Sequence, residues 1–542
     1  MKLHLVWFKR DLRVRDHQPL CQAARAARRD DGLVLPLYVI EPEYWQQPDT
    51  SLRQWQFTLE CLQDLGPALA SLGEFSTSNT TTECIGPQPF AQHLAPLQLF
   101  EGDVVECLEQ LAQHHSLTLY SHEETGNYWT FERDKQVKKW CRQHDVFWHE
   151  FRQFGVLRPN KDRDQWADWR EQWLTDAVAP TPHAVKFAPI FSENGLKSIA
   201  PLSKNSVSGF GFDQTPCPGR QIGGINIAHK TIFSFYHSRS EYYRGSISSP
   251  LSAERHCSRL SPYLAMGCIS LKELQLHNRK HIEKLQQQPQ PNRQWLGSLR
   301  NFESRLWWHC HFIQKLEDEP ESQWQSLHPA YRSLRSDSNP LYWQAWRNGQ
   351  TGWPLVDAAM RYLEHHGWIN FRLRAMLMSI ACYPLWLDWQ QPAQRLAQLF
   401  VDYEPGIHYP QAQMQAGATG INVLRMYNPT QQAIKLDPNG VFIRRWLPEL
   451  KNVPDTFIHQ PWLMNQRQQQ ACGVFMERDY PAPVVNFEQA IRYARSQLKG
   501  ITKAPEFRQH ASRIGHKHGS RQRSNVTTRP AAKTASSQLS LF

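Results

Sequence analysis

Two apolar runs near the start of the chain constrain its fold most. Leu3–Phe8 and Leu33–Val39 each have the composition of a buried strand. The basic segment between them, with Cys21 and the alanines of 23–27, has helical character. A strand, a helix and a second strand predict a parallel, Rossmann-like α/β sheet. No Gly-x-Gly-x-x-Gly motif follows the first strand, so a classical dinucleotide site is not indicated.

Length and composition indicate a soluble protein of more than one domain. The chain has 542 residues, 40% of them hydrophobic and 20% charged, which suits two or more globular domains. No apolar run is long enough to cross a bilayer, and the segment after Met1 lacks a signal-peptide core, so we expect a cytoplasmic protein without a membrane anchor. The eleven cysteines include no Cys-x-x-Cys pair, so no metal site is predicted.

Composition and periodicity divide the chain into four parts. We expect an α/β domain over 1–175, a connector rich in Pro, Gly and Ser over 176–240, an all-helical domain over 241–500 and a basic disordered tail over 501–542. The net charge is +11, and eight Lys/Arg against Glu506 place +7 of it after residue 500. A nucleic-acid surface on the folded body must therefore be a local patch.

Several motifs occur in a characteristic order along the chain. They are Lys9–His17, Ser258–Ser270, Phe302–Phe312, Trp353–Arg361, Gly367–Arg374, Arg425–Pro429 and Asp437–Leu450. Together they resemble the photolyase/cryptochrome family. The resemblance implies FAD bound by the helical domain, and a second antenna chromophore of unknown identity in the α/β domain.

The resemblance also implies a set of cofactor-binding residues. A helix start with free N–H groups suits the FAD diphosphate, and a buried Arg374 needs a carboxylate, which Asp402 supplies beside the flavin ring. Glu404 takes the place of the family's second Asp, and His408 is expected near flavin N5, with Tyr409 as its rival. The other expected cofactor contacts are Tyr243, Ser258, Arg259, Leu260, Ser261, Arg372, Tyr403 and Asn428.

The substrate side departs from the family pattern. Trp308 matches the tryptophan that stacks on damaged bases, whereas Arg305 stands where repair enzymes usually have Glu. Phe371 and Ala375 replace the usual Asn and Met, and they are not the two histidines common in (6-4) photoproduct enzymes. His309 and His311 lie on the same predicted helix and are also expected to contact DNA. Their spacing of two residues favours satisfied or surface histidines over metal ligands.

The electron relay to the flavin is also altered. Trp389 matches the middle tryptophan of the family's relay. Gln413 falls at the proximal position, with Gln415 two residues further on, and no Trp stands near Ser336 at the distal one. A glutamine is no ready one-electron donor, so the usual relay is interrupted. Trp386, Tyr409, Tyr403 or Trp343 are alternative carriers.

The last five residues carry a second resemblance. Gln538, Leu539, Leu541 and Phe542, with Ser540 between them, match the motif by which bacterial repair proteins bind the sliding clamp. We therefore predict a flavin-dependent, light-driven DNA repair lyase that splits cyclobutane pyrimidine dimers and acts as a monomer on damaged DNA, single- or double-stranded. The alternatives are a cryptochrome-like photoreceptor without repair activity, a (6-4) photoproduct enzyme and a non-catalytic DNA-binding flavoprotein.

Overall fold

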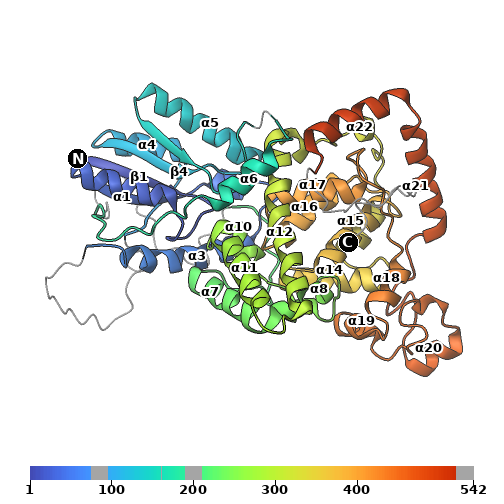
Figure 1. Cartoon of the computed structure of the whole chain (residues 1–542). Coiled ribbons are helices and arrows are strands. Elements are labelled where there is room, and N and C mark those ends of the chain that lie inside the picture. Colours follow the sequence, from blue (N-terminus) through green and yellow to red (C-terminus); the bar gives the residue numbers. More distant parts are fainter. Residues whose placement is uncertain (75–95, 160–161, 190–209, 521–542) are drawn as a thin grey trace, which may run out of the picture.

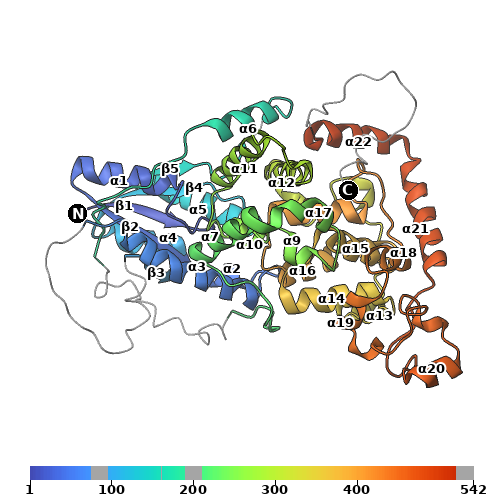
Figure 2. The same ribbon diagram turned by 60° about the horizontal axis from the view of Figure 1, so that its bottom comes forward.

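The computed structural model describes residues 1–74, 96–159, 162–189 and 210–520 (Figure 1). They form an α/β part and a helical part, with α12 (Arg293–Asp318) between the sheet and most other helices in both views (Figures 1 and 2). The predicted clamp motif and the Ser/Thr run from Ser76 to Thr82 lie outside these residues. No helix among the described residues is long and apolar enough to span a membrane.

The first part contains one parallel sheet, as predicted. Its strand order is β3-β2-β1-β4-β5, and every neighbouring pair is parallel. The strands are β1 (Lys2–Phe8), β2 (Leu33–Ile40), β3 (Gln98–Glu101), β4 (Ser116–His122) and β5 (Phe147–Phe151). In the central register Leu5 pairs with Leu35 on one side and with Leu119 on the other. The two apolar runs are therefore the neighbouring strands β1 and β2.

Helices cover both faces of this sheet. The helices of this part are α1 (Gln18–Asp30), α2 (Pro42–Trp45), α3 (Leu52–Ala70), α4 (Val104–Ala112), α5 (Tyr128–Gln143) and α6 (Trp166–Thr175). Val6 and Phe8 share a core with α1 and α3, whereas Leu5 and Trp7 share one with α4 and α5. Alternate residues of β1 thus face opposite cores, which explains why five of its seven residues are apolar.

The second part is helical, as the fold prediction states. Its α-helices, besides α12, are α7 (Ile225–Ser234), α8 (Tyr243–Ser246), α9 (Ala253–His256), α10 (Ser261–Ala265), α11 (Leu271–Gln286), α13 (Pro340–Arg347), α14 (Pro354–His366), α15 (Phe371–Cys382), α16 (Gln390–Leu399), α17 (Pro405–Ala416), α18 (Pro429–Leu436), α19 (Val441–Trp446), α20 (Gln466–Cys472), α21 (Phe487–Thr502) and α22 (Pro505–His518). The long α12 packs on α11 and α17. This packing brings residues distant in sequence to one place.

Two segments differ from the expected boundaries. The connector predicted for 176–240 contains the helix α7, followed by a π-helical turn at Phe235–Arg239. The tail predicted to be disordered from residue 501 is helical over Pro505–His518. The composition of α22 is mostly polar and charged, which predicts disorder, yet Ile514 and His518 are buried and Phe507 stacks on His328. Contacts with the rest of the protein stabilise it, which its own sequence does not reveal.

The two parts meet closely at Gly267. Its φ is +66°, and a Cβ there would lie 2.3 Å from Arg10 O and 2.5 Å from Asp11 Cα. In the same place the backbone N–H of Leu12 donates to Met266 O over 3.1 Å. Only glycine satisfies both the left-handed backbone and the close approach. The loop after β1 is therefore held against the helical part by backbone contact.

Candidate functional site

The predicted ion pair between α15 and the segment before α17 is present. Arg374 Nη2 lies 2.7 Å from Asp402 Oδ2. Arg374 Nε also donates to Ile369 O at 2.8 Å, and its guanidinium lies 4.1 Å from the Phe400 ring centroid. The Asp402 side chain is 2% exposed and that of Arg374 is 27% exposed. The pair therefore presents the cation outward from a buried carboxylate.

Two buried acceptors beside this pair have no donor among the described residues. They are Asp402 Oδ1 and Asn370 Oδ1. Asn370 is 3% exposed, and its Nδ2 donates to Ile247 O at 3.3 Å. Unsatisfied buried acceptors are costly, so they indicate a ligand with N–H or O–H groups. The flavin ring and ribityl chain of FAD carry such groups, so these residues fit the expected cofactor. Asn370 was not among the predicted contacts, although it stands within the Gly367–Arg374 motif.

Glu404 points to the α/β part. Its Oε2 accepts from Arg10 Nη2 at 2.8 Å, and burial raises the pKa of the carboxyl. Arg10 also donates to Ala265 O and Tyr403 O, both at 3.1 Å. Arg10 thus joins the loop after β1 to two segments of the helical part. Sequence reasoning missed this role, although Arg10 lies within the first motif.

Tyr403 and Tyr409 share one buried carboxylate. The Tyr403 hydroxyl donates to Asp49 Oδ2 at 2.5 Å, and the Tyr409 hydroxyl donates to the same oxygen at 3.3 Å. Asn127 Nδ2 lies 3.2 Å from Asp49 Oδ1. Burial raises the pKa of Asp49. Both phenol groups are therefore directed at the α/β part, and Tyr403 as a cofactor contact stays a prediction.

His408 hydrogen-bonds within the helical part. Its Nε2 lies 2.8 Å from Ala393 O, so Nε2 carries the proton and Nδ1 is the acceptor of a neutral ring. Burial lowers the pKa of this imidazole to about 4. His408 can accept a proton through Nδ1 but cannot donate one there. Its place beside flavin N5 stays a prediction.

The predicted phosphate segment forms a tight loop before α10. Arg259 has φ +60°, its Nε donates to Gln221 Oε1 at 2.9 Å and its guanidinium lies 4.1 Å from the Trp368 ring centroid. Gln221 Nε2 donates back to Arg259 O at 2.9 Å. Leu260 is fully buried, and the Ser258 hydroxyl accepts from the Leu260 N–H at 3.4 Å. Ser261 is the first residue of α10.

The remaining predicted cofactor contacts have structural partners of their own. Tyr243 is buried against the rings of Phe235 and Phe302. Arg372 Nη1 lies 3.0 Å from the Tyr427 hydroxyl. Asn428 caps α18 by accepting from the Gln431 N–H at 3.0 Å. These contacts fix the side chains in place, and their roles toward FAD stay predictions.

The predicted substrate residues lie on α12 and α15. Trp308 is half-buried, stacks on Phe312 with ring centroids 5.4 Å apart, and has an indole N–H without an acceptor among the described residues. Arg305 Cζ lies 5.6 Å from the Phe371 ring centroid, which connects the two helices. Ala375, one turn beyond Phe371 on α15, is 4% exposed.

The two histidines of α12 diverge. His309 is packed edge-on against Phe154, with centroids 4.8 Å apart, and burial lowers its pKa to about 3. His311 accepts through Nδ1 from Arg163 Nη2. His309 is thus buried against Phe154 and His311 against Trp166 of α6, so the two rings face different neighbours. Their predicted contact with DNA stays a prediction.

The relay position Gln413 is locked by hydrogen bonds. Its Oε1 accepts from Leu327 N at 2.8 Å, while Nε2 donates to Ser322 O at 2.6 Å and to Gln325 O at 2.8 Å. Trp389 is 2% exposed and its indole N–H donates to Ser326 Oγ at 3.0 Å. The amide of Gln413 is therefore held by three backbone groups, and the relay role of Trp389 stays a prediction.

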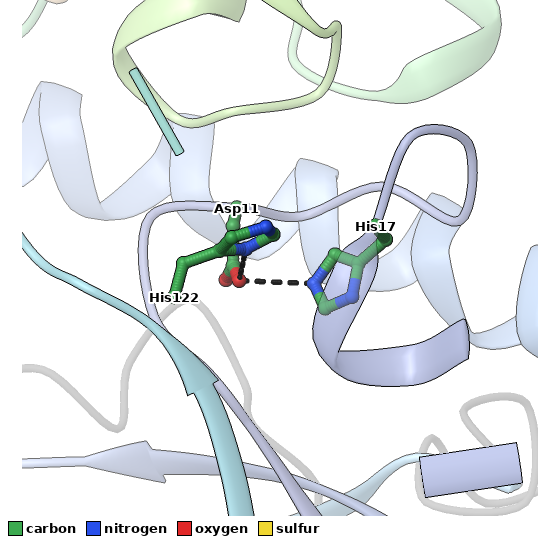
Figure 3. Close-up of side chains that lie close together, drawn as sticks. All are labelled: Asp11, His17 and His122. Atoms are coloured by element: carbon green, nitrogen blue, oxygen red, sulfur yellow. Dashed lines mark hydrogen bonds and ion pairs between the residues drawn. The ribbon is translucent and has the colours of Figure 1, made fainter. Parts of the chain in front are cut away.

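Asp11, His17 and His122 form the one group of side chains among the described residues that is close enough to hold a metal ion (Figure 3). His17 Nε2 lies 2.9 Å and His122 Nδ1 2.7 Å from Asp11 Oδ2. Burial disfavours the carboxylate, but the two imidazoles outweigh it and hold the pKa of Asp11 well below its usual value.

Hydrogen-bond directions account for this group without a metal. His17 Nδ1 accepts from Leu20 N at 3.1 Å as the cap of α1, so its proton is on Nε2 and points at Asp11. The other carboxylate oxygen accepts from the Lys9 N–H at 2.8 Å. A metal on His17 Nε2 would move that proton to Nδ1, against the Leu20 N–H. The group therefore anchors the loop after β1.

Charged side chains fill the carboxyl ends of β1, β2 and β4. Arg133 pairs with Glu41 at 2.7 Å, with Asp134 at 2.8 Å and with Glu124, and Lys9 Nζ lies 3.2 Å from Asp134. The Arg133 guanidinium also lies 4.7 Å from the Trp7 ring centroid. A small cavity beside them is lined by both apolar and charged residues, among them Tyr38, Tyr44 and Met266.

Comparisons with known proteins agree with this architecture. Residues 302–500 match the FAD binding domain of DNA photolyase, and residues 4–77 match the DNA photolyase domain. The chain is 28% identical to the deoxyribodipyrimidine photo-lyase of Salmonella typhimurium, over 90% of this chain and 97% of the relative. It is 26% identical to the cryptochrome DASH of Synechocystis, over 91% and 96%.

A solved structure has the same fold. The Synechocystis cryptochrome superposes with a TM-score of 0.74 at 22% identity, covering 91% of this chain and 98% of that one. At this identity the likeness concerns the fold alone. One assignment agrees with all of these observations: the two matched domain families, the sheet order, the helical part and the unsatisfied acceptors beside Arg374–Asp402. The chain belongs to the photolyase/cryptochrome family and contains its FAD-binding domain.

Proposed function

We propose that this protein is an FAD-dependent lyase that uses blue light to split cyclobutane pyrimidine dimers in DNA. The observation that carries the proposal is Trp308, half-buried on α12 with a free indole N–H and stacked on Phe312. A flat aromatic surface with an unused donor suits a flipped-out pair of bases. Relatives named deoxyribodipyrimidine photo-lyase support the same activity.

The residues of this chain would hold the cofactor and the lesion. The loop of Ser258 and Arg259 would receive the FAD diphosphate, while Arg374, Asp402 and Asn370 would bind the polar groups of the flavin. Reduced FAD supplies a photoexcited electron when bound. Arg305 would then stabilise the negative charge that the dimer gains, because a cation in a partly buried site acts strongly on a nearby charge.

A second candidate is a photoreceptor without repair activity. The observations that favour it are the Arg305–Phe371 contact, where repair enzymes usually have Glu and Asn, and the locked amide of Gln413. Cryptochromes are also among the relatives. A (6-4) photoproduct activity and a non-catalytic DNA-binding role have no specific observation in their favour.

A light-dependent repair assay separates these candidates. The purified protein, with its flavin chemically reduced, is mixed with dimer-containing oligonucleotides, single- and double-stranded, in blue light and in darkness. We expect loss of dimers only in the light, and much less of it in a Trp308→Ala variant. Intact dimers in the light, with flavin bound and reduced, would favour the photoreceptor.

The clamp motif and the antenna chromophore belong to the same proposal. Deleting 538–542 should abolish binding to a bacterial sliding clamp without changing flavin content; persistent binding would show that the motif is incidental. We also propose that the protein acts as a cytoplasmic monomer. A second chromophore would appear as absorption beyond the flavin bands in the purified protein, and a pure flavin spectrum would show that none is retained.

A further inference from the structure

Lys315, near the end of α12, is a buried residue whose ammonium group has no partner among the described residues. The residue is 8% exposed, and no hydrogen bond or ion pair joins its Nζ to any residue in the described part of the chain. Its Nζ lies 5.1 Å from the Phe312 ring centroid. Burial, followed by the charge of Arg163, lowers the pKa of Lys315 to about 7. A buried cation of this kind is costly unless an anion approaches it.

The charged groups around Lys315 leave it without a counterion of its own. Arg163 donates to His311 Nδ1, which makes His311 a neutral acceptor. Glu319 is the carboxylate on this side of α12, and its Oε2 already accepts from Lys517 Nζ at 2.8 Å and His518 Nε2 at 2.9 Å. His518 and Lys517 together hold the pKa of Glu319 at about 2, against the effect of burial.

His518 contributes a second unsatisfied atom. The residue is fully buried at the end of α22, and its Nδ1 has no partner among the described residues. Because Nε2 donates to Glu319, Nδ1 becomes a donor only when the ring is protonated. Glu319 lies four residues after Lys315, so the imidazole that is bound to it lies on the same face of α12 as the ammonium. An anion between them would satisfy both.

The position of Lys315 on α12 relates it to the proposed lesion site. Trp308, Phe312 and Lys315 are spaced by four and three residues, so they lie along one face of α12. The Phe312 ring stacks on Trp308 at 5.4 Å and 26°, and the ammonium lies over the same ring. Seven residues of helix span about 10 Å, a distance that a nucleic-acid strand covers within a few phosphates.

We propose that Lys315, flanked by Arg163 and His518, binds a phosphate group of the DNA strand whose bases stack on Trp308. This inference rests on the proposed function. The phosphate oxygens accept from the ammonium, and the negative charge removes the cost of burying it. Binding should therefore strengthen as the pH falls through 7, since Lys315 is then fully charged. A free phosphate ion offers the same chemistry, so the test must separate the two sources.

The test measures binding of an undamaged oligothymidylate by fluorescence anisotropy with the full-length flavoprotein. Lys315→Met should weaken binding about fivefold at low salt and reduce the slope of log K against log[salt] by about 0.7, the value for one phosphate contact on a single strand. Lys315→Arg should retain the affinity but lose the change between pH 6 and pH 8.5. Lys284→Met, which removes an exposed lysine of α11, is the matched control and should behave like the wild type.

Three results would overturn the inference. Equal salt slopes for Lys315→Met and Lys284→Met would show that Lys315 contacts no DNA phosphate. A second result would be a broadened ³¹P signal of inorganic phosphate that depends on Lys315 while DNA binding stays unchanged. It would mean that Lys315 binds the free ion. If the wild type does not bind DNA at all, the proposed function fails together with this inference. The first two results, in contrast, leave the proposed function intact. Thermal unfolding of each variant shows whether it is folded.

Discussion

Arg374 Nη2 lies 2.7 Å from Asp402 Oδ2, and this contact joins α15 to the segment that leads into α17. The carboxylate is 2% exposed, and its second oxygen has no donor among the described residues. The pair therefore has two roles. It holds α15 to that segment, and it leaves one acceptor for a ligand.

Asp402→Ala tests both roles. We expect most of the bound flavin to be lost, and the free energy of unfolding to fall by about 2 kcal/mol, less than for a fully buried pair because the Arg374 side chain is 27% exposed. Flavin content is measured by absorbance and stability by urea unfolding. Glu449→Ala removes the carboxylate from a more exposed pair with Arg361 and serves as the control, with a change under about 1 kcal/mol. Full flavin content in Asp402→Ala would contradict the site.

Gly267 and Gly473 form a matched pair for testing the junction between the two parts. Their φ values are +66° and +69°, but a Cβ at Gly267 would lie 2.3 Å from Arg10 O, whereas one at Gly473 would meet nothing within 4 Å. Gly473→Ala should cost about 1 kcal/mol of backbone strain alone. Gly267→Ala should cost several kcal/mol, because the loop after β1 must also move. Equal losses in thermal unfolding would show that the junction can relax.

Glu41 is expected to make stability depend on pH. Burial raises its pKa to about 7, against the opposing effect of Arg133. The folded state thus binds this proton more tightly than the unfolded chain. The stabilisation of the folded state by this proton is complete below about pH 4.5 and is lost as the pH rises through 7. Glu41→Gln should remove this dependence of stability on pH and, at pH 8, raise the free energy of unfolding by up to about 3 kcal/mol.

Urea unfolding at pH 5, 6, 7 and 8 measures the effect. Glu43→Gln, an exposed carboxylate on α2, is the control and should leave the pH profile unchanged. Because Glu124 and Asp134 also pair with Arg133, the guanidinium keeps partners in Glu41→Gln. A variant that is less stable than the wild type at pH 8 would mean that the Glu41–Arg133 attraction exceeds the cost of burial.

The sequence predicted the parts of the structure that depend on local pattern. Periodicity within short segments predicts the strands β1 and β2 and the helical domain, and the resemblance to the family predicts the Arg374–Asp402 pair. Asp49 was missed, since its hydroxyl partner Tyr403 is 354 residues away and nothing near Asp49 marks it as buried. The same holds for Arg10, whose partner Glu404 is 394 residues away. Interdomain contacts of this kind depend on how the two parts pack, which local sequence does not encode.

Gln413 provides the sharpest test of the altered electron relay. Its amide makes three hydrogen bonds to the backbone at Ser322, Gln325 and Leu327. The sequence analysis predicts this residue at the proximal position of the family's relay. In Gln413→Trp we expect faster light-driven reduction of the bound flavin, because an oxidisable ring then stands between the flavin and Trp389. We also expect lower stability, since the larger side chain must displace three satisfied bonds. The rate is followed by the decay of oxidised flavin absorbance under blue light with excess thiol.

Two further variants separate electron transfer from disturbed packing. Gln413→Leu also breaks the three hydrogen bonds but supplies no oxidisable ring, so it should lower stability without raising the rate. Adding Trp389→Phe to Gln413→Trp should abolish the gain, because the electron would then stop at the proximal ring. If the wild type is already reduced as fast as Gln413→Trp, the electron takes another route. One aromatic pair to examine is then Trp386 and Tyr493, whose ring centroids lie 5.3 Å apart.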